Sequence, residues 1–398
     1  MRPIHYLVLF ITLNHTAMAA ARVAVPLYAI HLHASPTVVG ILVGLFAIVP
    51  TLASVPIGRL VDRIGTRSPL IVFLLLMIGA MVIPLFSGDL VLPLYAVALL
   101  VGGAYFALMI VNTALGGYYG DPHERSGNFT QISLGYATAN GVGPLMAGVA
   151  IDHAGFKLTF LLLALPSLVT LAIYLMGKLP QRGPVEVQHQ AAAAKRSVME
   201  LWRNKNMRPI FMISIYFMLF WDIFLVMTPI YGAELAVSAS VIGIVIATFS
   251  AASFLVRICI VPLSRRFTPL QLLLMSQAVG ALGMLAFGLS TTEALLIVFA
   301  FVMGMGQGMG GPMVTTALYD ASPAERISEA IGLRMSVGMA CQAILPLFAG
   351  VAASATGVAA LFWVTALILF FGVWQYRAQW YVDLRAGNSV KIAEDKRK

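Results

Sequence analysis

Three ionisable side chains interrupt stretches of sequence that are otherwise apolar: His15, Arg22 and Asp222. A carboxylic acid in such surroundings can take up and release a proton, and an arginine can pair with its carboxylate. An imidazole can also carry a proton, although a buried neutral histidine is an equally good interpretation of His15. We therefore expect Arg22, Asp222 and His15 to form a coupling or gating site. The alternative for Arg22 and Asp222 is a purely structural salt bridge.

Further polar and soft side chains recur at helical spacing in the same kind of sequence. Residues three or four apart share one face of a helix, as in the series Asn14, Met18 and Arg22 and in the series Tyr105, Met109 and Asn112. We expect these faces to line a substrate cavity, together with Asn140, Trp221, Gln307 and Gln342. Each polar member could instead form a helix–helix hydrogen bond, and the methionines could simply fill the core.

The motifs of several other functional classes are missing from the sequence. It contains no H-E-x-x-H, no G-x-S-x-G, no Cys/His cluster at metal spacing and no phosphate loop G-x-x-x-x-G-K-[ST]. Cys259 and Cys341 lie in apolar stretches and are interpreted as small buried hydrophobic residues. We therefore expect no enzyme, no metal site, no cofactor and no nucleotide-driven pump.

The elements that must position these residues follow from composition. Hydrophobic residues make up 60% of the 398 residues, charged residues only 10%, and the mean hydropathy is +0.90. A soluble surface needs more polar residues than this, whereas a bilayer solvates apolar side chains and is crossed by about 20 apolar residues in helical form. The first apolar run is too long for a signal peptide and contains Arg22. Twelve transmembrane helices are expected over residues 4–30, 37–58, 69–87, 90–118, 129–151, 156–178, 208–233, 238–262, 268–290, 292–319, 328–352 and 357–381.

The placement of positive charge predicts the topology of these helices. All of the 25 lysines and arginines except Lys157 and Arg22 fall in or next to segments that would face the cytoplasm if both termini lie there. The net charge of +9 is thereby explained without a nucleic-acid partner. The polar segment 179–207 is expected to be a cytoplasmic central loop between an N-terminal six-helix bundle, 1–178, and a C-terminal one, 208–381. Residues 382–398 would form a cytoplasmic tail.

The two halves of the chain contain related sequence. Pro144-Leu-Met-Ala-Gly-Val-Ala150 is repeated as Pro346-Leu-Phe-Ala-Gly-Val-Ala352, at a distance of 202 residues. Gly155 and Gly357 keep this distance, as do Asn140 and Gln342, and Arg22 and Asp222 lie 200 residues apart. Such a duplication is typical of transporters that bind substrate between two halves. It predicts that Arg22 and Asp222 lie at similar depth on opposite halves.

One loop carries a family resemblance. The sequence Gly58-Arg-Leu-Val-Asp62-Arg63-Ile-Gly65-Thr-Arg67-Ser-Pro-Leu70 resembles the signature loop of the major facilitator superfamily, with Thr66 in place of one basic residue. The resemblance implies an all-α membrane fold of twelve helices in two pseudo-symmetric six-helix bundles, with the first, fourth, seventh and tenth helices around the cavity. It also implies that the signature loop is a conformational latch formed by Gly58, Asp62, Arg63, Gly65 and Arg67. The corresponding loop of the second half has no equivalent of Asp62, which implies an asymmetric latch.

The fifth expected helix carries a second, partial resemblance. Its segment from Gly135 to Gly148 is similar to the Gly-Pro motif of antiporters in this superfamily, although Ala147 replaces one glycine. Gly143, Pro144 and Gly148 are also the residues that generic close helix packing would use. The arginine that many proton-coupled drug antiporters carry on the fourth helix is absent here. A proton relay through that position is therefore excluded.

These observations favour secondary active transport across the cytoplasmic (inner) membrane by a multi-pass protein, as in bacterial drug and metabolite efflux members of the superfamily. We expect proton-coupled efflux of a small, amphipathic molecule by alternating access. The alternatives are a proton-coupled uptake symporter and a non-transporting receptor or scaffold on the same fold. The expected partners are the small-molecule substrate, protons and membrane lipids, and we expect a monomer.

Overall fold

The computed structural model describes residues 3–86, 88–118, 125–177, 198–205, 207–264, 266–322 and 326–395. In these ranges the secondary structure is helical, without strands. The helices are α1 (Pro3–His31), α2 (Pro36–Ile64), α3 (Arg67–Phe86), α4 (Leu92–Tyr118), α5 (Arg125–Leu175), α6 (Val198–Arg203), α7 (Arg208–Glu234), α8 (Ala239–Ser264), α9 (Pro269–Phe287), α10 (Glu293–Gly308), α11 (Gly310–Ala321), α12 (Ile327–Thr356) and α13 (Val358–Asp395).

These helices correspond to the twelve expected transmembrane helices once two irregularities are taken into account: one long helix contains two crossings, and one crossing is divided into two helices. Among the residues that the structure describes, eleven helical stretches are long and apolar enough to span a membrane. One of them, Leu134–Leu175, has 42 residues, about twice the length of one crossing. This stretch of α5 bends at Gly155, where φ is 75° and a glycine avoids the steric cost of that conformation. Helices α10 and α11 together form the expected helix 292–319, which is interrupted at Met309.

The segments that are expected outside the membrane contain helical structure where they are described. Residues 178–197, most of the predicted central loop, lie outside the described residues, and α6 forms the end of that segment. Glu200 of α6 forms an ion pair with Arg326 at 2.9 Å. Helix α13 continues through Asp395, so that most of the predicted tail 382–398 is helical.

The internal repeat is visible in the backbone. The helices α1 and α7 are each followed by a non-glycine residue with positive φ, His33 at 60° and Ala236 at 54°. Each turn then leads to a serine whose hydroxyl accepts a hydrogen bond from the backbone three residues later, Ser35 from Val38 and Ser238 from Val241. Gly155 and Gly357 also share a positive φ, of 75° and 84°. The two halves therefore use the same turns at corresponding positions.

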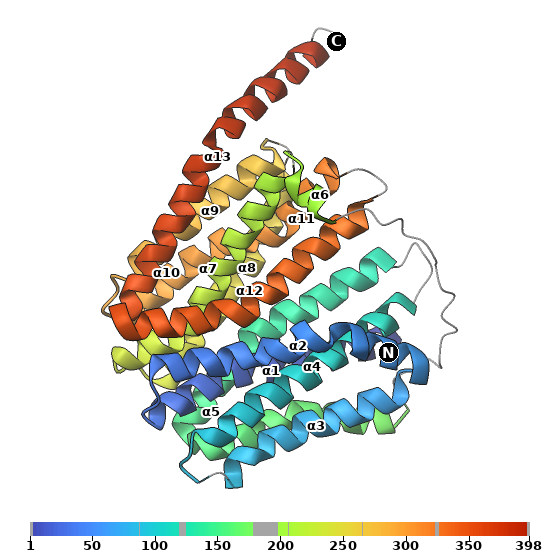
Figure 1. Ribbon diagram of the computed structural model, residues 1–398, viewed down its shortest axis with the longest axis vertical. Coiled ribbons are helices and arrows are strands. Elements are labelled where there is room, and N and C mark those ends of the chain that lie inside the picture. Colours follow the sequence, from blue (N-terminus) through green and yellow to red (C-terminus); the bar gives the residue numbers. More distant parts are fainter. Residues whose placement is uncertain are drawn as a thin grey trace. The chain divides into compact units, whose positions relative to one another are not determined.

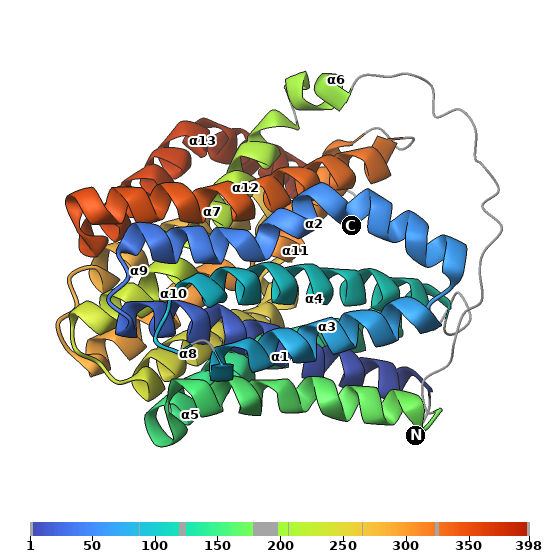
Figure 2. The same ribbon diagram turned by 60° about the horizontal axis from the view of Figure 1, so that its bottom comes forward.

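The helices are grouped into two compact units. The first contains residues 1–193, 222–250 and 339–358, and the second contains residues 194–221, 251–338 and 359–398. In the first unit α1 packs on α5, α2 packs on α4, and α3 packs on α4 and α5, as Figure 2 shows for α2, α3 and α4. In the second unit α9 packs on α10 and α11.

Small residues permit these close approaches. A side chain at Gly102 of α4 would collide with the backbone of Phe46 in α2, and one at Gly143 of α5 would collide with Thr16 and Ala19 in α1. In the second unit Gly306 of α10 lies against the backbone of Gly280 in α9. Between helices in lipid, such packing replaces the hydrophobic driving force that acts in water.

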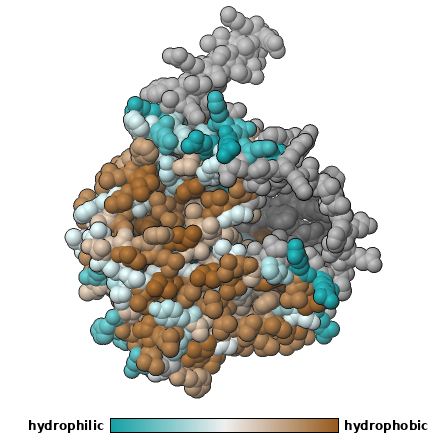
Figure 3. All heavy atoms as spheres, in the orientation of Figure 1, coloured by the Kyte–Doolittle hydropathy of each residue, from teal (hydrophilic) through white to brown (hydrophobic). Residues whose placement is uncertain are grey.

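The outer surface is apolar. On the face seen in Figure 3, hydrophobic residues cover most of the described surface. Large side chains that would be buried in a soluble protein are exposed, among them Leu52, Leu282, Leu367 and Phe348. Such a surface is stable only against lipid, and the composition argument for a membrane protein is thereby supported.

Candidate functional site

Arg22 and Asp222 lie in the same compact unit, on α1 and α7. The side chain of Asp222 is only 1% exposed, and neither of its carboxylate oxygens has a hydrogen-bond partner among the described residues. The Nε atom of Arg22 is likewise buried without a partner. The two charges interact electrostatically, but they form neither a hydrogen bond nor an ion pair within the described part of the chain.

His15 lies about two turns before Arg22 on the same helix, α1, and joins an aromatic cluster. Its Nδ1 atom lies 2.5 Å from the hydroxyl of Tyr105 in α4, and its ring meets that of Tyr136 in α5 edge-on, with centroids 5.0 Å apart. Its Nε2 atom is buried without a hydrogen-bond partner among the described residues. Tyr105 is also an electrostatic neighbour of Arg22. Tyr105 is therefore a neighbour of both the histidine and the arginine.

A residue of α5 completes this polar cluster, and residues of α12 lie nearby. The side-chain amide of Asn140 donates to the backbone carbonyl of Tyr136 at 3.1 Å, and the backbone carbonyl of Asn140 accepts from the hydroxyl of Ser250 in α8 at 3.0 Å. Cys341 of α12 is half-buried and is an electrostatic neighbour of Asp222, and its chain neighbour Gln342 is also half-buried. We call the set His15, Arg22, Tyr105, Tyr136, Asn140 and Asp222 the polar cluster; it draws on α1, α4, α5 and α7.

Other predicted cavity residues have varied surroundings. Asn14 is buried between α1 and α5: it donates to Phe10 at 2.9 Å and to Thr170 at 3.2 Å, and it accepts from Ser167 at 3.2 Å. Met18 is buried, and Asn112 is buried with its Oδ1 atom unpartnered among the described residues.

The remaining predicted cavity residues are half-buried: Met109, Trp221 and Gln307. Gln307 and Trp221 belong to the second compact unit, where Gln307 donates to the carbonyl of Phe217 at 3.3 Å.

The signature loop connects α2 and α3. Gly65 ends α2 with φ at 79°, a conformation that favours glycine, and Arg67 begins α3. Arg63 and Arg67 are exposed, whereas the surroundings of Gly58 and of the Asp62 side chain lie outside what the structure describes. The turn geometry therefore explains Gly65 directly, and the latch role of the loop stays a prediction.

The repeated Pro-to-Gly segments form two equivalent contacts in the first unit. In α5, Gly148 lies against Ala239 and Ser240 at the start of α8, and Pro144 lies against Gly243. In α12, Gly350 lies against Pro36 and Gly40 near the start of α2, and Pro346 also lies against Gly40. Figures 1 and 2 show α12 running alongside α2. We refer to these as the α5–α8 contact and the α2–α12 contact.

The polar ends of the two contacts differ. Asp152, at the end of the first part of α5, accepts hydrogen bonds from the backbone amides of Ala239 at 3.2 Å and Ser240 at 2.7 Å. A carboxylate at the N-terminus of α8 is favoured by the helix dipole as well as by these bonds. The corresponding position of the repeat is Ser354, whose hydroxyl lies 2.9 Å from that of Thr37 in α2. One contact is therefore charged and the other neutral.

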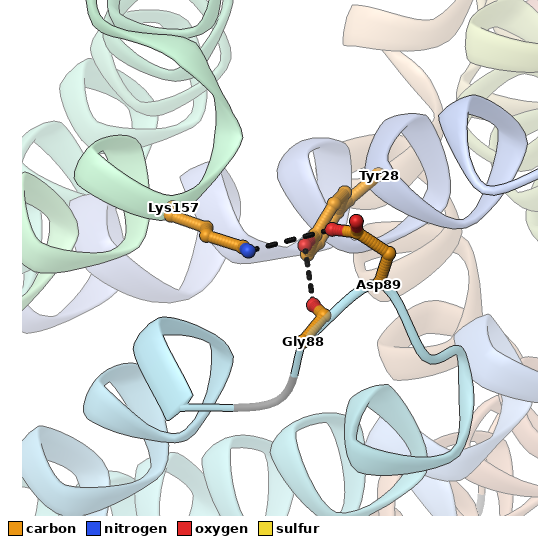
Figure 4. Close-up of polar contacts among 4 residues, drawn as sticks. All are labelled: Tyr28, Gly88, Asp89 and Lys157. Atoms are coloured by element: carbon orange, nitrogen blue, oxygen red, sulfur yellow. Dashed lines mark hydrogen bonds and ion pairs between the residues drawn. The ribbon is translucent and has the colours of Figure 1, made fainter.

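The connection between α3 and α4 contacts α1 and the second part of α5. Figure 4 shows Lys157 and Asp89, whose charged atoms lie 3.4 Å apart, beside Tyr28, whose hydroxyl donates to the carbonyl of Gly88 at 3.3 Å. The ring of Tyr28 stacks on that of Phe156 with centroids 5.0 Å apart. Lys157 is the lysine that the expected topology would place outside the cell, and its partner Asp89 lies in the connection between α3 and α4.

Sequence reasoning overlooked two arginines within apolar helices. Arg334 lies inside α12 and donates to the hydroxyls of Ser214 at 3.1 Å and Thr315 at 3.2 Å. Arg257 lies inside α8 and donates to the carbonyl of Gly308 at 3.4 Å. Both were expected to flank the membrane because each lies near the expected cytoplasmic end of its helix. No group of three or more potential metal ligands occurs among the described residues.

Comparison with known proteins agrees with this architecture. The family model described as Major Facilitator Superfamily matches residues 7–235 and again residues 210–397. An uncharacterised transporter of this type from Methanocaldococcus jannaschii is 23% identical over 363 residues, which cover 83% of this chain and 87% of that protein.

Several solved transporters share the fold. A POT family transporter in complex with 5-aminolevulinic acid has a TM-score of 0.77 at 13% identity, with 95% of this chain and 96% of that chain covered. The nucleoside transporter NupG has a TM-score of 0.73 at 15% identity, with coverage of 95% and 99%. A bacterial homologue of the human lysosomal transporter Spinster has a TM-score of 0.71 at 16% identity, with coverage of 94% and 96%. With its family match along nearly the whole chain and its two related halves of membrane-spanning helices, this chain belongs to the major facilitator superfamily of membrane transporters.

Proposed function

We propose that this transporter exports a small, amphipathic molecule from the cytoplasm in exchange for protons, with Asp222 as the proton-carrying residue. The observation that carries the proposal is the state of Asp222, a deeply buried carboxyl group with no hydrogen-bond partner among the described residues. Ionisable groups at such depth are costly and are retained mainly for function. Arg22 is the charged neighbour that would favour release of the proton when the two approach.

Alternating access supplies the cycle in this proposal. When the two halves separate on the outer side, Asp222 would move away from Arg22 and take up a proton. When they close again, the arginine would favour the carboxylate and the proton would leave on the other side. Substrate that competes with the proton for Asp222 would make the two fluxes run in opposite directions. The latch residues, above all Asp62, would stabilise the cytoplasmic ends of the halves in one state. Both chain termini would lie in the cytoplasm.

The fifth helix supports exchange over symport. Its Gly-Pro segment provides the close contacts of Gly143 with α1 and of Gly148 with α8. Tight seals of this kind would keep protons from leaking during an exchange cycle. Uptake by symport would use the same buried carboxyl group, and the direction of coupled flux distinguishes the two.

The test measures flux through the full chain in proteoliposomes with an imposed pH gradient. A panel of fluorescent dyes and small metabolites is offered, and we expect at least one compound to move uphill in the direction opposite to protons. Asp222→Asn should abolish this uphill movement while leaving downhill exchange or binding, because the amide cannot be deprotonated. Asp89→Asn is the matched control, since the Asp89 side chain is 82% exposed, and it should transport normally.

The other possible results of the flux measurement would each support a different alternative. Movement in the same direction as protons would make the protein an uptake symporter. Binding of compounds without any flux would indicate a receptor. If Asp222→Asn still concentrates a compound against its gradient, Asp222 is not the coupling residue and His15 becomes the next candidate.

A further inference from the structure

The polar cluster contains two opposite charges that are not bonded to each other: Asp222 is buried and Arg22 is half-buried. The carboxylate oxygens of Asp222 and the Nε atom of Arg22 all lack hydrogen-bond partners among the described residues. A buried structural salt bridge is stable only when good geometry and additional hydrogen bonds offset the cost of removing both charges from water. An arginine and a carboxylate that serve this purpose usually meet through two parallel N–H···O bonds. Arg22 and Asp222 interact electrostatically without forming that arrangement.

The surrounding residues do not neutralise either group. The polar neighbours on α4 and α5, Tyr105 and Tyr136, are uncharged phenols, and His15 is bonded to Tyr105. Asn140 is bonded to the backbone of its own helix. The cluster therefore presents one cationic and one anionic group, in an otherwise neutral and partly aromatic setting.

We propose that Arg22 and Asp222 together recognise a small zwitterion, with the carboxylate of the substrate on Arg22 and its protonated amine on Asp222. A molecule with both charges would supply a partner to each buried group, and the complex would carry no net charge into the membrane interior. Met18 of α1 and the rings of Tyr105 and Tyr136 are the neighbouring surfaces against which an apolar remainder of the substrate would pack. This inference rests on the proposed function, since it assigns the substrate class of the same site.

The same geometry also predicts how substrate and proton would exchange at this site. The ammonium group of the substrate and a proton would be alternative occupants of the Asp222 carboxylate. A compound with only a positive charge would leave Arg22 unpaired, and one with only a negative charge would leave Asp222 unpaired. Both should therefore bind much more weakly than a zwitterion of the same shape.

The experiment measures binding to the purified full chain in detergent, by thermal stabilisation and by calorimetric titration. The probes are leucine and phenylalanine with α-, β- and γ-amino spacing. Each is compared with its methyl ester, which keeps only the amine charge, its N-acetyl derivative, which keeps only the carboxylate, and its doubly blocked form. We expect at least one zwitterion to bind about 30-fold or more tightly than each of its three derivatives. The proposal is overturned if no zwitterion binds, or if an ester or N-acetyl derivative binds as tightly as its parent.

Two variants assign the charges to their residues. Asp222→Asn should reduce the preference for the zwitterion over its N-acetyl derivative to roughly onefold, because the amide no longer attracts an ammonium group. Arg22→Gln should do the same for the preference over the methyl ester. Asp89→Asn and Arg377→Gln remove exposed charges and should leave both ratios unchanged. Unchanged ratios in Asp222→Asn and Arg22→Gln would overturn the assignment. If either variant binds no probe, the proposal is judged from the wild-type protein alone, by the affinity of each zwitterion relative to its three derivatives.

This test can fail independently of the proposed function. Zwitterion binding with these selectivities, but without flux driven by a pH gradient, would support the substrate class and refute proton-coupled export. Flux of a singly charged compound against protons, with no zwitterion bound, would support the export and refute the substrate class.

Discussion

Asn14 is fixed between α1 and the second part of α5 by three hydrogen bonds. Its amide donates to Phe10 and Thr170, and its carbonyl oxygen accepts from Ser167. A side chain with all of these bonds satisfied within the protein has little capacity left for a substrate. The geometry favours helix packing for Asn14, whereas the unpartnered groups of Arg22, Asp222 and His15 remain available for chemistry.

A substitution of Asn14 separates these two roles. Asn14→Ala should lower the stability of the folded protein by about 1 kcal/mol, which is typical of an interhelical hydrogen bond in a membrane protein. The apparent affinity for transported compounds should not change. Thermal unfolding in detergent and transport kinetics provide the two measurements. Thr356→Ala, which removes an exposed hydroxyl bonded within its own helix, is the control for stability. A weaker affinity with unchanged stability would place Asn14 in the substrate cavity instead.

At the level of helices, the α5–α8 and α2–α12 contacts are two copies of one interaction. In each, a segment that runs from proline to glycine lets the backbone of another helix approach closely. Glycine at these positions is required by contact between helices, because a β-carbon would overlap backbone atoms that cannot move aside. In the proposed cycle of alternating access, both contacts would form when this end of the helices closes and break when it opens.

A larger side chain in one contact should therefore keep it open. In Gly350→Val the new β-carbon would lie 2.6 Å from the carbonyl oxygen of Pro36 and 3.0 Å from the Cα of Gly40. Spin labels at Ala34 and Thr356 should report a longer distance than in the wild type, and transport should fall severely. Gly79→Val in α3 is the matched control, because no atom lies within 4 Å of its added β-carbon. An unchanged distance in Gly350→Val would show that the α2–α12 contact is not part of the moving closure.

The charged end of the α5–α8 contact makes a separate prediction. Asp152→Ala removes the acceptor of the amides of Ala239 and Ser240, and it should weaken the contact by about 1 kcal/mol, as for the loss of a helix cap. Asp152→Asn should have a smaller effect, since an amide oxygen still accepts a hydrogen bond. Thermal unfolding provides the measurement, with Asp89→Asn as the control for loss of an exposed carboxylate. Equal stability of Asp152→Ala and wild type would mean that water replaces the carboxylate without cost.

For the whole molecule, the distribution of positive charge determines which side of the membrane each connection faces. The 25 lysines and arginines and the twelve expected helices agree with each other only if both termini and residues 179–207 lie in the cytoplasm. The connection between α3 and α4 would then lie outside, where Asp89 pairs with Lys157.

Single cysteines test this topology. In a background with Cys259 and Cys341 replaced by serine, a cysteine at Asp89 should react with a membrane-impermeant maleimide added to intact cells. A cysteine at Ser197 should react only after the membrane is opened. Reaction of both from the same side would rule out an arrangement with twelve transmembrane helices.

Much of the architecture could be predicted from the sequence because it depends on local properties. Composition and the length of apolar runs identified the membrane and the number of helices, and short matching segments identified the repeat, whose glycines at 155 and 357 share a positive φ. The signature loop identified the family, which the match over residues 7–235 and 210–397 confirms. None of these features requires knowledge of which helix touches which.

The partners of individual side chains were decided only by the tertiary structure. Asn14 meets Thr170 across 156 positions of the sequence, and Asp152 meets Ser240 across 88. Such contacts depend on the rotation of each helix about its axis and on its crossing angle with its neighbours. Hydropathy carries little information about either, because most of these helices are apolar on all sides. For the same reason the sequence could place Arg22 and Asp222 at similar depth, but it could not tell a salt bridge from two unbonded charges. The folded structure leaves the two charges unbonded because their helices hold them near each other without bringing the groups into contact.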